Sequence, residues 1–143
     1  MFYITDANGN RAVAFEGGAV ANMEVVTEAK TLTVEDSGKV FALTAAAGAD
    51  ITLPAVAKGL CYKFYVGSSF ATTDWTITAA SKVIQGSVVC NAAYVTGVNE
   101  DIITLVKAKA AAGDYIELVS DGTNWYVSGN VVVVAGITLT ASA

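Results

Sequence analysis

The first chemical feature of this 143-residue sequence is that it contains no histidine. Histidine is the side chain whose ordinary pKa lies nearest neutral pH, so catalytic triads, general bases and metal sites that need histidine are excluded. Two cysteines without histidine also make no zinc site. Any chemistry must therefore come from carboxylates, lysines, hydroxyls or thiols.

The tripeptide Ser37-Gly38-Lys39 has residue types found in phosphate-binding loops. That motif needs a glycine five residues before its Gly-Lys pair and a serine or threonine directly after the lysine. This chain has Thr33 and Val40 at those two positions. We therefore interpret the tripeptide as a β-turn.

Asn99-Glu100-Asp101 offers side-chain oxygens of the kind that bind Ca²⁺. A calcium loop spaces its ligands at alternate positions, whereas these three residues are consecutive. The sequence favours a solvated turn here.

Glu117 is the acidic residue set within a patterned strand beside aromatic residues. A glycosidase needs two carboxylates that are close in space, which sequence does not report. We interpret Glu117 as an outward-facing strand residue. Tyr and Trp can stack on sugars, but Trp75 and Trp125 alternate in phase with Ile or Val, which favours core packing. We identify no catalytic, cofactor-binding or metal-binding residues and expect that the protein is not an enzyme.

The elements that would position any site are β-strands, and the clearest of them lie in residues 114–128, DYIELVSDGTNWYVS. Ile116 and Leu118 occupy alternate positions before the turn residues Asp121-Gly122-Thr123-Asn124, and Trp125 and Val127 do so after them, which predicts a β-hairpin with one apolar side. Because a lone hairpin is marginal in water, we expect its apolar side to pack against another layer.

Strand-like segments recur along the chain at intervals of about ten residues, separated by turn formers, as in all-β sandwiches and barrels. We predict one domain, an antiparallel β-sandwich of jelly-roll type. Residues 1–30 are expected to form an N-terminal arm with a hairpin in residues 2–15, before Gly17-Gly18. Residues 31–129 are expected to form the core, and residues 130–143 a C-terminal strand or tail that the core or another chain covers.

Alternation in these segments also predicts which side chains are buried. We expect the core to contain the following residues: Ile51, Leu53, Tyr62, Phe64, Val66, Trp75, Ile77, Ile103, Leu105, Ile116, Leu118, Trp125 and Val127. Cys61 falls on the opposite side of its strand from Tyr62 and Phe64. Nothing aligns it with Cys90, so we expect two free thiols.

Composition sets limits on partners. The hydrophobic fraction is 54% and the charged fraction is 15%, against about 25% in typical domains, so we expect apolar surface that faces other subunits. The net charge is −5 with scattered lysines, which argues against nucleic-acid binding. The longest apolar run, residues 131–137, is too short for a membrane span. The start, MFYITD, lacks the features of a secretory signal.

Several segments together carry a family pattern: SGKVFALTAAAGADITLPA, GLCYKFYV, TDWTITA and AGDYIELVSDGTNWYVSG. They resemble a β-rich module of virion proteins in tailed bacteriophages, in particular capsid decoration (cement) proteins. Similar patterns also occur in phage tail-fibre and receptor-binding proteins. The resemblance covers residues 31–129, and its motifs mark turns and strands rather than catalytic residues.

The resemblance implies a structural virion protein that lies on the outer capsid surface and reinforces contacts between major capsid proteins. It implies a homo-oligomer, with a trimer preferred, that is made in the host bacterial cytoplasm and uses no cofactor. The expected partners are the major capsid protein and other copies of this chain, without nucleic acid or membrane. The alternative is a tail-fibre or receptor-binding module that recognises host surface glycans.

Overall fold

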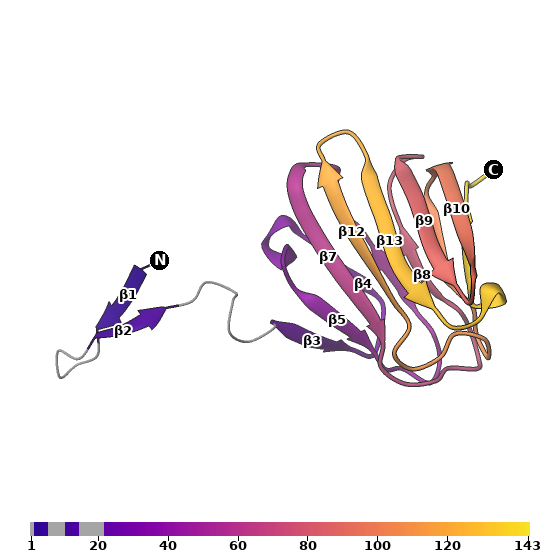
Figure 1. The fold of residues 1–143 in the computed structure, drawn as a ribbon, viewed down its shortest axis with the longest axis horizontal. Coiled ribbons are helices and arrows are strands. Elements are labelled where there is room, and N and C mark those ends of the chain that lie inside the picture. Colours follow the sequence, from indigo (N-terminus) through magenta and orange to yellow (C-terminus); the bar gives the residue numbers. More distant parts are fainter. Residues whose placement is uncertain (1, 6–10, 15–21) are drawn as a thin grey trace.

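The computed structural model describes residues 2–5, 11–14 and 22–143, with side chains from residue 22 onward. A sheet of seven strands and a sheet of five strands pack together, which confirms the predicted all-β sandwich (Figure 1). The strands are β1 Phe2–Thr5, β2 Arg11–Ala14, β3 Met23–Val26, β4 Lys30–Thr31, β5 Val40–Leu43, β6 Asp50–Thr52, β7 Lys58–Val66, β8 Trp75–Thr78, β9 Ile84–Cys90, β10 Ala93–Glu100, β11 Ile102–Leu105, β12 Tyr115–Asp121, β13 Trp125–Val131 and β14 Ile137–Thr140. Two 3-10 turns, η1 Val34–Asp36 and η2 Val134–Gly136, are the helical segments of the described residues.

The predicted hairpin of residues 114–128 lies in the middle of the larger sheet, whose order is β10-β9-β13-β12-β7-β5-β3. Strands β12 and β13 pair antiparallel, with Leu118 opposite Val127. The carboxylate of Asp121 accepts hydrogen bonds from the backbone N–H groups of Thr123 and Asn124, both at 2.8 Å. The turn residues thus act as predicted, since Asp bonds to nearby backbone and closes the turn.

The first six strands of the sandwich wind alternately through the two sheets. Strands β3, β5 and β7 are parallel neighbours in the larger sheet, and β4, β6 and β8 are parallel neighbours in the smaller one. Each of these strands is followed by a strand in the opposite sheet. When the chain crosses back to the first sheet, the next strand there runs in the same direction as the previous one. The sheets are therefore mixed rather than purely antiparallel, because a crossover through the second layer supplies the connection that parallel neighbours require.

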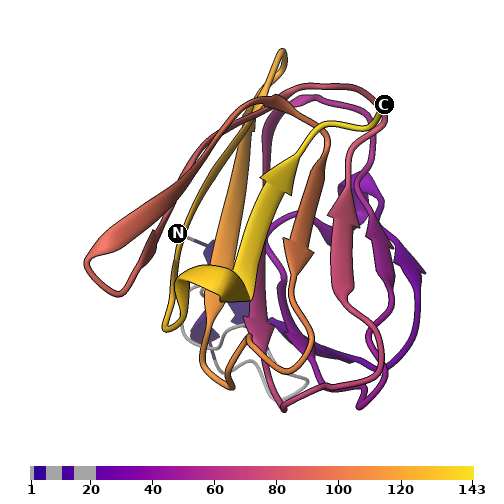
Figure 2. The same ribbon diagram turned by 90° about the vertical axis from the view of Figure 1, so that its right-hand side faces the viewer.

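The second half of the chain contributes two hairpins and the remaining strands. Strands β9 and β10 form an antiparallel hairpin, and β9 runs parallel to β13. The smaller sheet has the order β14-β11-β8-β6-β4, with β11 antiparallel to both of its neighbours. Figure 2 shows the β9–β10 hairpin reaching out beyond the rest of the sandwich.

The core between the sheets contains all thirteen side chains that alternation placed there, each less than 5% exposed. Trp75 and Trp125 are fully buried, and the ring centroid of Trp125 lies 5.7 Å from that of Tyr62. Further large side chains complete the core, among them Phe41, Leu43, Phe70, Ile84 and Val131. The predicted core is confirmed because the period of two reports the buried side of each strand.

The sandwich extends beyond residues 31–129 at both ends. Strands β3 and β4 are edge strands of the two sheets, and Val26 is buried. At the other end β14 pairs with β11 and buries Ile137 and Leu139, so the core itself covers this part of the C-terminal segment.

The predicted N-terminal hairpin is present as β1 and β2, which pair antiparallel in a separate two-stranded sheet. Its predicted turn was residues 6–11, of which Arg11 begins β2. Residues 6–10 and the glycines at positions 17 and 18 lie outside the described residues.

Both cysteines are free, as predicted. Cys61 is partly exposed and Cys90 is buried, and burial raises the pKa of the Cys90 thiol. Among the described residues no helix has the length and apolar character to cross a membrane.

Candidate functional site

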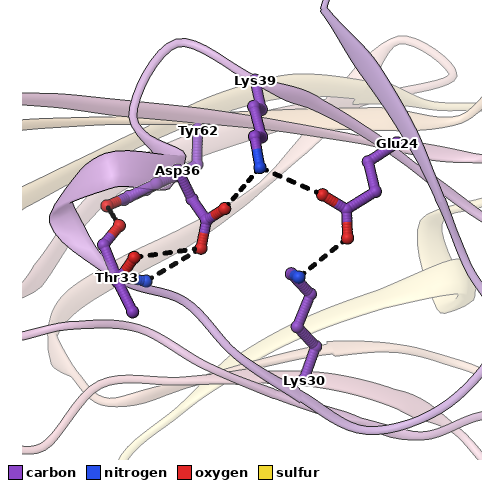
Figure 3. Close-up of polar contacts among 6 residues, drawn as sticks. All are labelled: Glu24, Lys30, Thr33, Asp36, Lys39 and Tyr62. Atoms are coloured by element: carbon purple, nitrogen blue, oxygen red, sulfur yellow. Dashed lines mark hydrogen bonds and ion pairs between the residues drawn. The ribbon is translucent and has the colours of Figure 1, made fainter.

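Four charged side chains form a network that joins the first strands of the sandwich (Figure 3). Glu24 on β3 accepts from Lys30 on β4, with an N–O distance of 2.7 Å, and from Lys39 at 3.2 Å. Lys39 also lies 2.7 Å from a carboxylate oxygen of Asp36 in η1. The network therefore ties both sheets to the turn that connects β4 with β5.

The carboxylate of Asp36 accepts hydrogen bonds within this turn. Its Oδ2 accepts from the backbone N–H of Thr33 at 3.0 Å, and its Oδ1 accepts from Lys39. The hydroxyl of Tyr62 donates to the carbonyl of Thr33 at 2.8 Å, which fixes the turn against β7. Burial raises the pKa of Tyr62, so this hydroxyl keeps its proton.

The protonation states in the network do not suit acid–base catalysis. Hydrogen bonds from Lys30 and Lys39 lower the pKa of Glu24, and the hydrogen bond from Lys39 lowers that of Asp36. The same bonds raise the pKa of Lys39. Glu24, Asp36 and Lys39 therefore stay charged at neutral pH, whereas a general acid needs a raised carboxyl pKa. We interpret the network as structural.

Ser37-Gly38-Lys39 lies in the turn after η1, as the sequence predicted. The N–H of Gly38 donates to the carbonyl of Cys61 at 2.8 Å, and the residue has a φ of +89°, which glycine adopts without strain. Because the ammonium of Lys39 is already bonded to two carboxylates, it is not free to bind a phosphate.

Asn99-Glu100-Asp101 lies where β10 gives way to β11. The side chain of Asn99 bonds to that of Gln85, and the carboxylate of Asp101 accepts from the N–H and hydroxyl of Ser142. These bonds from Ser142 lower the pKa of Asp101. Within the described part of the chain no three His, Cys, Asp or Glu side chains gather as metal ligands.

The structure also places the residues considered for sugar chemistry. Glu117 lies on the outer side of β12, opposite Lys63 and Ser128, so its strand neighbours supply no second carboxylate. Trp75 and Trp125 are 0% exposed, which confirms their core role and rules them out as sugar-stacking surfaces.

The solvent side of the seven-stranded sheet, called here the outer face, is the most unusual surface of the described molecule. Its large hydrophobic side chains that are exposed by 43% to 71% are Met23, Val25, Val89, Tyr94, Val98, Val119 and Tyr126. They come from both edges and the centre of one sheet. The composition led us to expect exposed apolar surface, but it did not indicate which side of the protein would carry it.

Charged residues on the outer face occur as opposite pairs. Lys63 is the register partner of Glu117, and Lys58 is that of Asp121. The ammonium of Lys63 also lies 4.8 Å from the ring centroid of Tyr115 and 5.2 Å from that of Tyr65. The centre of the face therefore combines aromatic rings with charges that cancel locally.

The solvent side of the five-stranded sheet has a different character. Its strands align threonines in two rows: Thr31, Thr52 and Thr78, which Ile102 separates from Thr140, and Thr76, Thr104 and Thr138. Threonine suits an exposed strand position because it is β-branched and carries a hydroxyl. One side of the sandwich is thus hydroxyl-rich, whereas the other exposes large apolar groups.

A pocket beside β3 and β4 is small. It is lined by residues 24–30 and has a volume of about 140 Å³, below the 300–1,000 Å³ that is common for small-molecule sites. The outer face is therefore the stronger candidate site, as a surface that contacts a macromolecule.

Sequence reasoning did not identify the residues of this face. The signal was present in β9 and β10, where Val88-Val89 and Tyr94-Val95 put apolar residues on both sides of the strand. In a strand with one side exposed to water, one residue of each of these two pairs would be polar. Comparison with protein-family models, curated proteins and solved structures finds no match for this chain.

Proposed function

We propose that this protein is a structural component of a tailed-bacteriophage virion that binds the outer capsid surface and reinforces contacts between major capsid proteins. The observation that carries the proposal is the outer face, a broad, partly apolar surface with paired charges. Such a surface suits protein contact, since interface cores are depleted of charge and enriched in Tyr and Met. The sequence resemblance supplies the capsid context.

The charge of the chain supports a position outside the shell. A net charge of −5 disfavours close contact with packaged DNA, whose phosphates repel acidic surfaces. Reinforcement follows from selective binding. A subunit that binds the assembled shell, and not its dispersed subunits, shifts the equilibrium towards the intact particle by mass action.

The test compares particles that carry the protein with particles that lack it. Copies per particle are counted, and both populations are heated or osmotically shocked while DNA release is measured. We expect a copy number comparable with that of the major capsid protein and later DNA release from decorated particles. Equal release from both populations, with the protein shown to be bound, would overturn the proposal.

A second candidate function is glycan recognition by a tail-fibre or receptor-binding module. It is favoured by four tyrosines on the outer face, Tyr65, Tyr94, Tyr115 and Tyr126, because aromatic rings stack on the apolar sides of sugars. This function predicts a tail-like copy number and binding of the purified protein to host-cell polysaccharide. Tyr94→Ala and Tyr126→Ala should weaken that binding, whereas cement activity needs no glycan.

A further inference from the structure

We infer, on the basis of the proposed function, that Glu117 determines the specificity of the capsid contact by binding an arginine of the partner protein. Glu117 lies on β12, the central strand of the seven-stranded sheet (Figure 1). The partner surface that fits the outer face therefore carries a protruding basic side chain, and this chain supplies the carboxylate that receives it.

The register of the sheet places uncharged side chains on three sides of Glu117. Ser128 on β13 lies opposite it, and Tyr115 and Val119 are the nearest residues on the same side of β12. The fourth neighbour is Lys63 on β7, its register partner. Glu117 is half-buried among these groups, so its carboxylate has already lost part of its contact with water.

Lys63, the neighbouring cation, has its ammonium over aromatic rings. The Nζ atom lies 4.8 Å from the ring centroid of Tyr115 and 5.2 Å from that of Tyr65. A hydrogen bond to Tyr65 raises the pKa of Lys63, so the ammonium stays charged in this position. Glu117 takes part in none of the ion pairs between described side chains. Its negative charge is therefore available to a partner.

A capsid protein that covers the outer face removes the remaining water from Glu117. An ionised carboxylate that is buried without a paired cation is strongly destabilising. Because Lys63 is already engaged by aromatic rings, the cation must come from the partner. Arginine fits this position better than lysine, since a guanidinium binds a carboxylate through two parallel N–H groups and stacks on rings such as that of Tyr115.

The charge and composition of this chain favour a different protein over a second copy as the source of the arginine. The chain has one arginine, Arg11, which lies on β2 in the separate N-terminal sheet. The net charge of −5 makes copies repel each other, whereas it attracts a basic surface. Arg11→Gln is therefore a control that should leave capsid binding unchanged.

The first test measures binding of the purified protein to particles that lack it, by co-sedimentation at several salt concentrations. We expect Glu117→Gln to bind at least about tenfold more weakly than wild type, and Glu117→Lys at least about a hundredfold, with wild-type circular dichroism. The matched control is Glu35→Gln, which removes the same charge from an exposed residue of η1 and should bind like wild type.

A double-mutant cycle with Lys63→Met separates the partner's arginine from a rearranged pair between Lys63 and Glu117. We expect Glu117→Gln to weaken binding by the same factor in the Lys63→Met background as in wild type. If Lys63→Met abolishes that effect, the two residues pair with each other in the complex and the inference is wrong.

Selection identifies the cation on the partner. Capsid-protein changes that restore binding of the Glu117→Lys variant should replace an arginine by a neutral or acidic residue. Restoration through replacement of a lysine, with no change at any arginine, would contradict the assignment of arginine.

The outcomes for the inference and for the proposed function are distinct. Wild-type protein that binds the particles while Glu117→Gln binds equally well at every salt concentration would overturn the role of Glu117 and leave capsid binding intact. Wild-type protein that does not bind the particles would overturn both.

Discussion

Trp125 shows how much of the stability rests on single core side chains. It is fully buried between the sheets beside Tyr62, so replacement by alanine removes a large ring and leaves a cavity. We expect Trp125→Ala to lower the free energy of unfolding by about 3–5 kcal/mol, out of the roughly 5–15 kcal/mol that is typical of a domain. Urea denaturation measures the change.

The matched control is Trp125→Phe. The indole N–H of Trp125 has no hydrogen-bond partner among the described atoms, so phenylalanine removes volume without breaking a hydrogen bond. We expect a smaller loss than for alanine. An unchanged denaturation midpoint in Trp125→Ala would contradict the burial of this residue.

The Glu24–Asp36–Lys39 network predicts how stability depends on pH. Folding lowers both carboxyl pKa values from their ordinary 4.5 and 3.8, chiefly through the lysines, so in acid the unfolded chain binds more protons than the folded one. The stabilisation is complete above about pH 5 and is lost as pH falls through the lowered folded values. We expect the thermal midpoint of unfolding to decrease as the pH is lowered below about 5.

Lys39→Met tests the cause. Without this ammonium the carboxyl pKa values move back towards their ordinary values, so stability should depend less steeply on pH in the acid range. Lys109→Met is the control, because Lys109 is exposed and takes part in none of the ion pairs described. Identical acid profiles for Lys39→Met and wild type would show that other groups set the pH dependence.

At the scale of elements, the turn of the β9–β10 hairpin holds strain that a substitution can remove. Its two residues, Asn91 and Ala92, have φ values of +38° and +65°. Asparagine adopts this region more readily than alanine, for which it costs roughly 1–2 kcal/mol, and Asn-Gly is the preferred pair for such turns. We expect Ala92→Gly to stabilise the protein by roughly 0.5–1 kcal/mol, after the greater freedom of glycine in the unfolded chain is subtracted.

Thermal unfolding measures this gain, with Ala112→Gly as the control. Ala112 is also exposed but is not among the residues with positive φ, so glycine there should destabilise the chain. A lower midpoint for Ala92→Gly would show that the backbone at this turn is not strained.

For the whole molecule, the two chain ends should respond differently to deletion. The β1–β2 hairpin forms its own sheet, so removal of residues 1–18 should leave the thermal midpoint of the sandwich nearly unchanged. Removal of residues 131–143 takes away β14 and exposes the partners of Val131, Ile137 and Leu139. We expect that truncation to unfold the protein at room temperature.

This expected loss follows from the contacts of the C-terminal segment with the core, because β14 pairs with β11. Beyond β14, the bonds from Ser142 to Asp101 hold the segment against the smaller sheet. A folded protein after removal of residues 131–143, shown by circular dichroism, would mean that β14 contributes little to the core.

The sequence alone determined the fold class, the central hairpin, the free thiols and the thirteen core residues. These features depend on the alternation of side chains and on turn-forming residues within a short segment. The sequence of one strand or turn is therefore enough to indicate them. The same local information placed Cys61 on the opposite side of its strand from Tyr62.

Only the tertiary structure decided how the strands are ordered and what their outer sides form. Alternation is identical in parallel and antiparallel strands, so it could not show that β3, β5 and β7 run parallel. The network between Glu24 and Lys39 and the outer face bring together residues distant in sequence. Their proximity depends on which strands pair, and that choice is made by burial of the whole core rather than by any one segment.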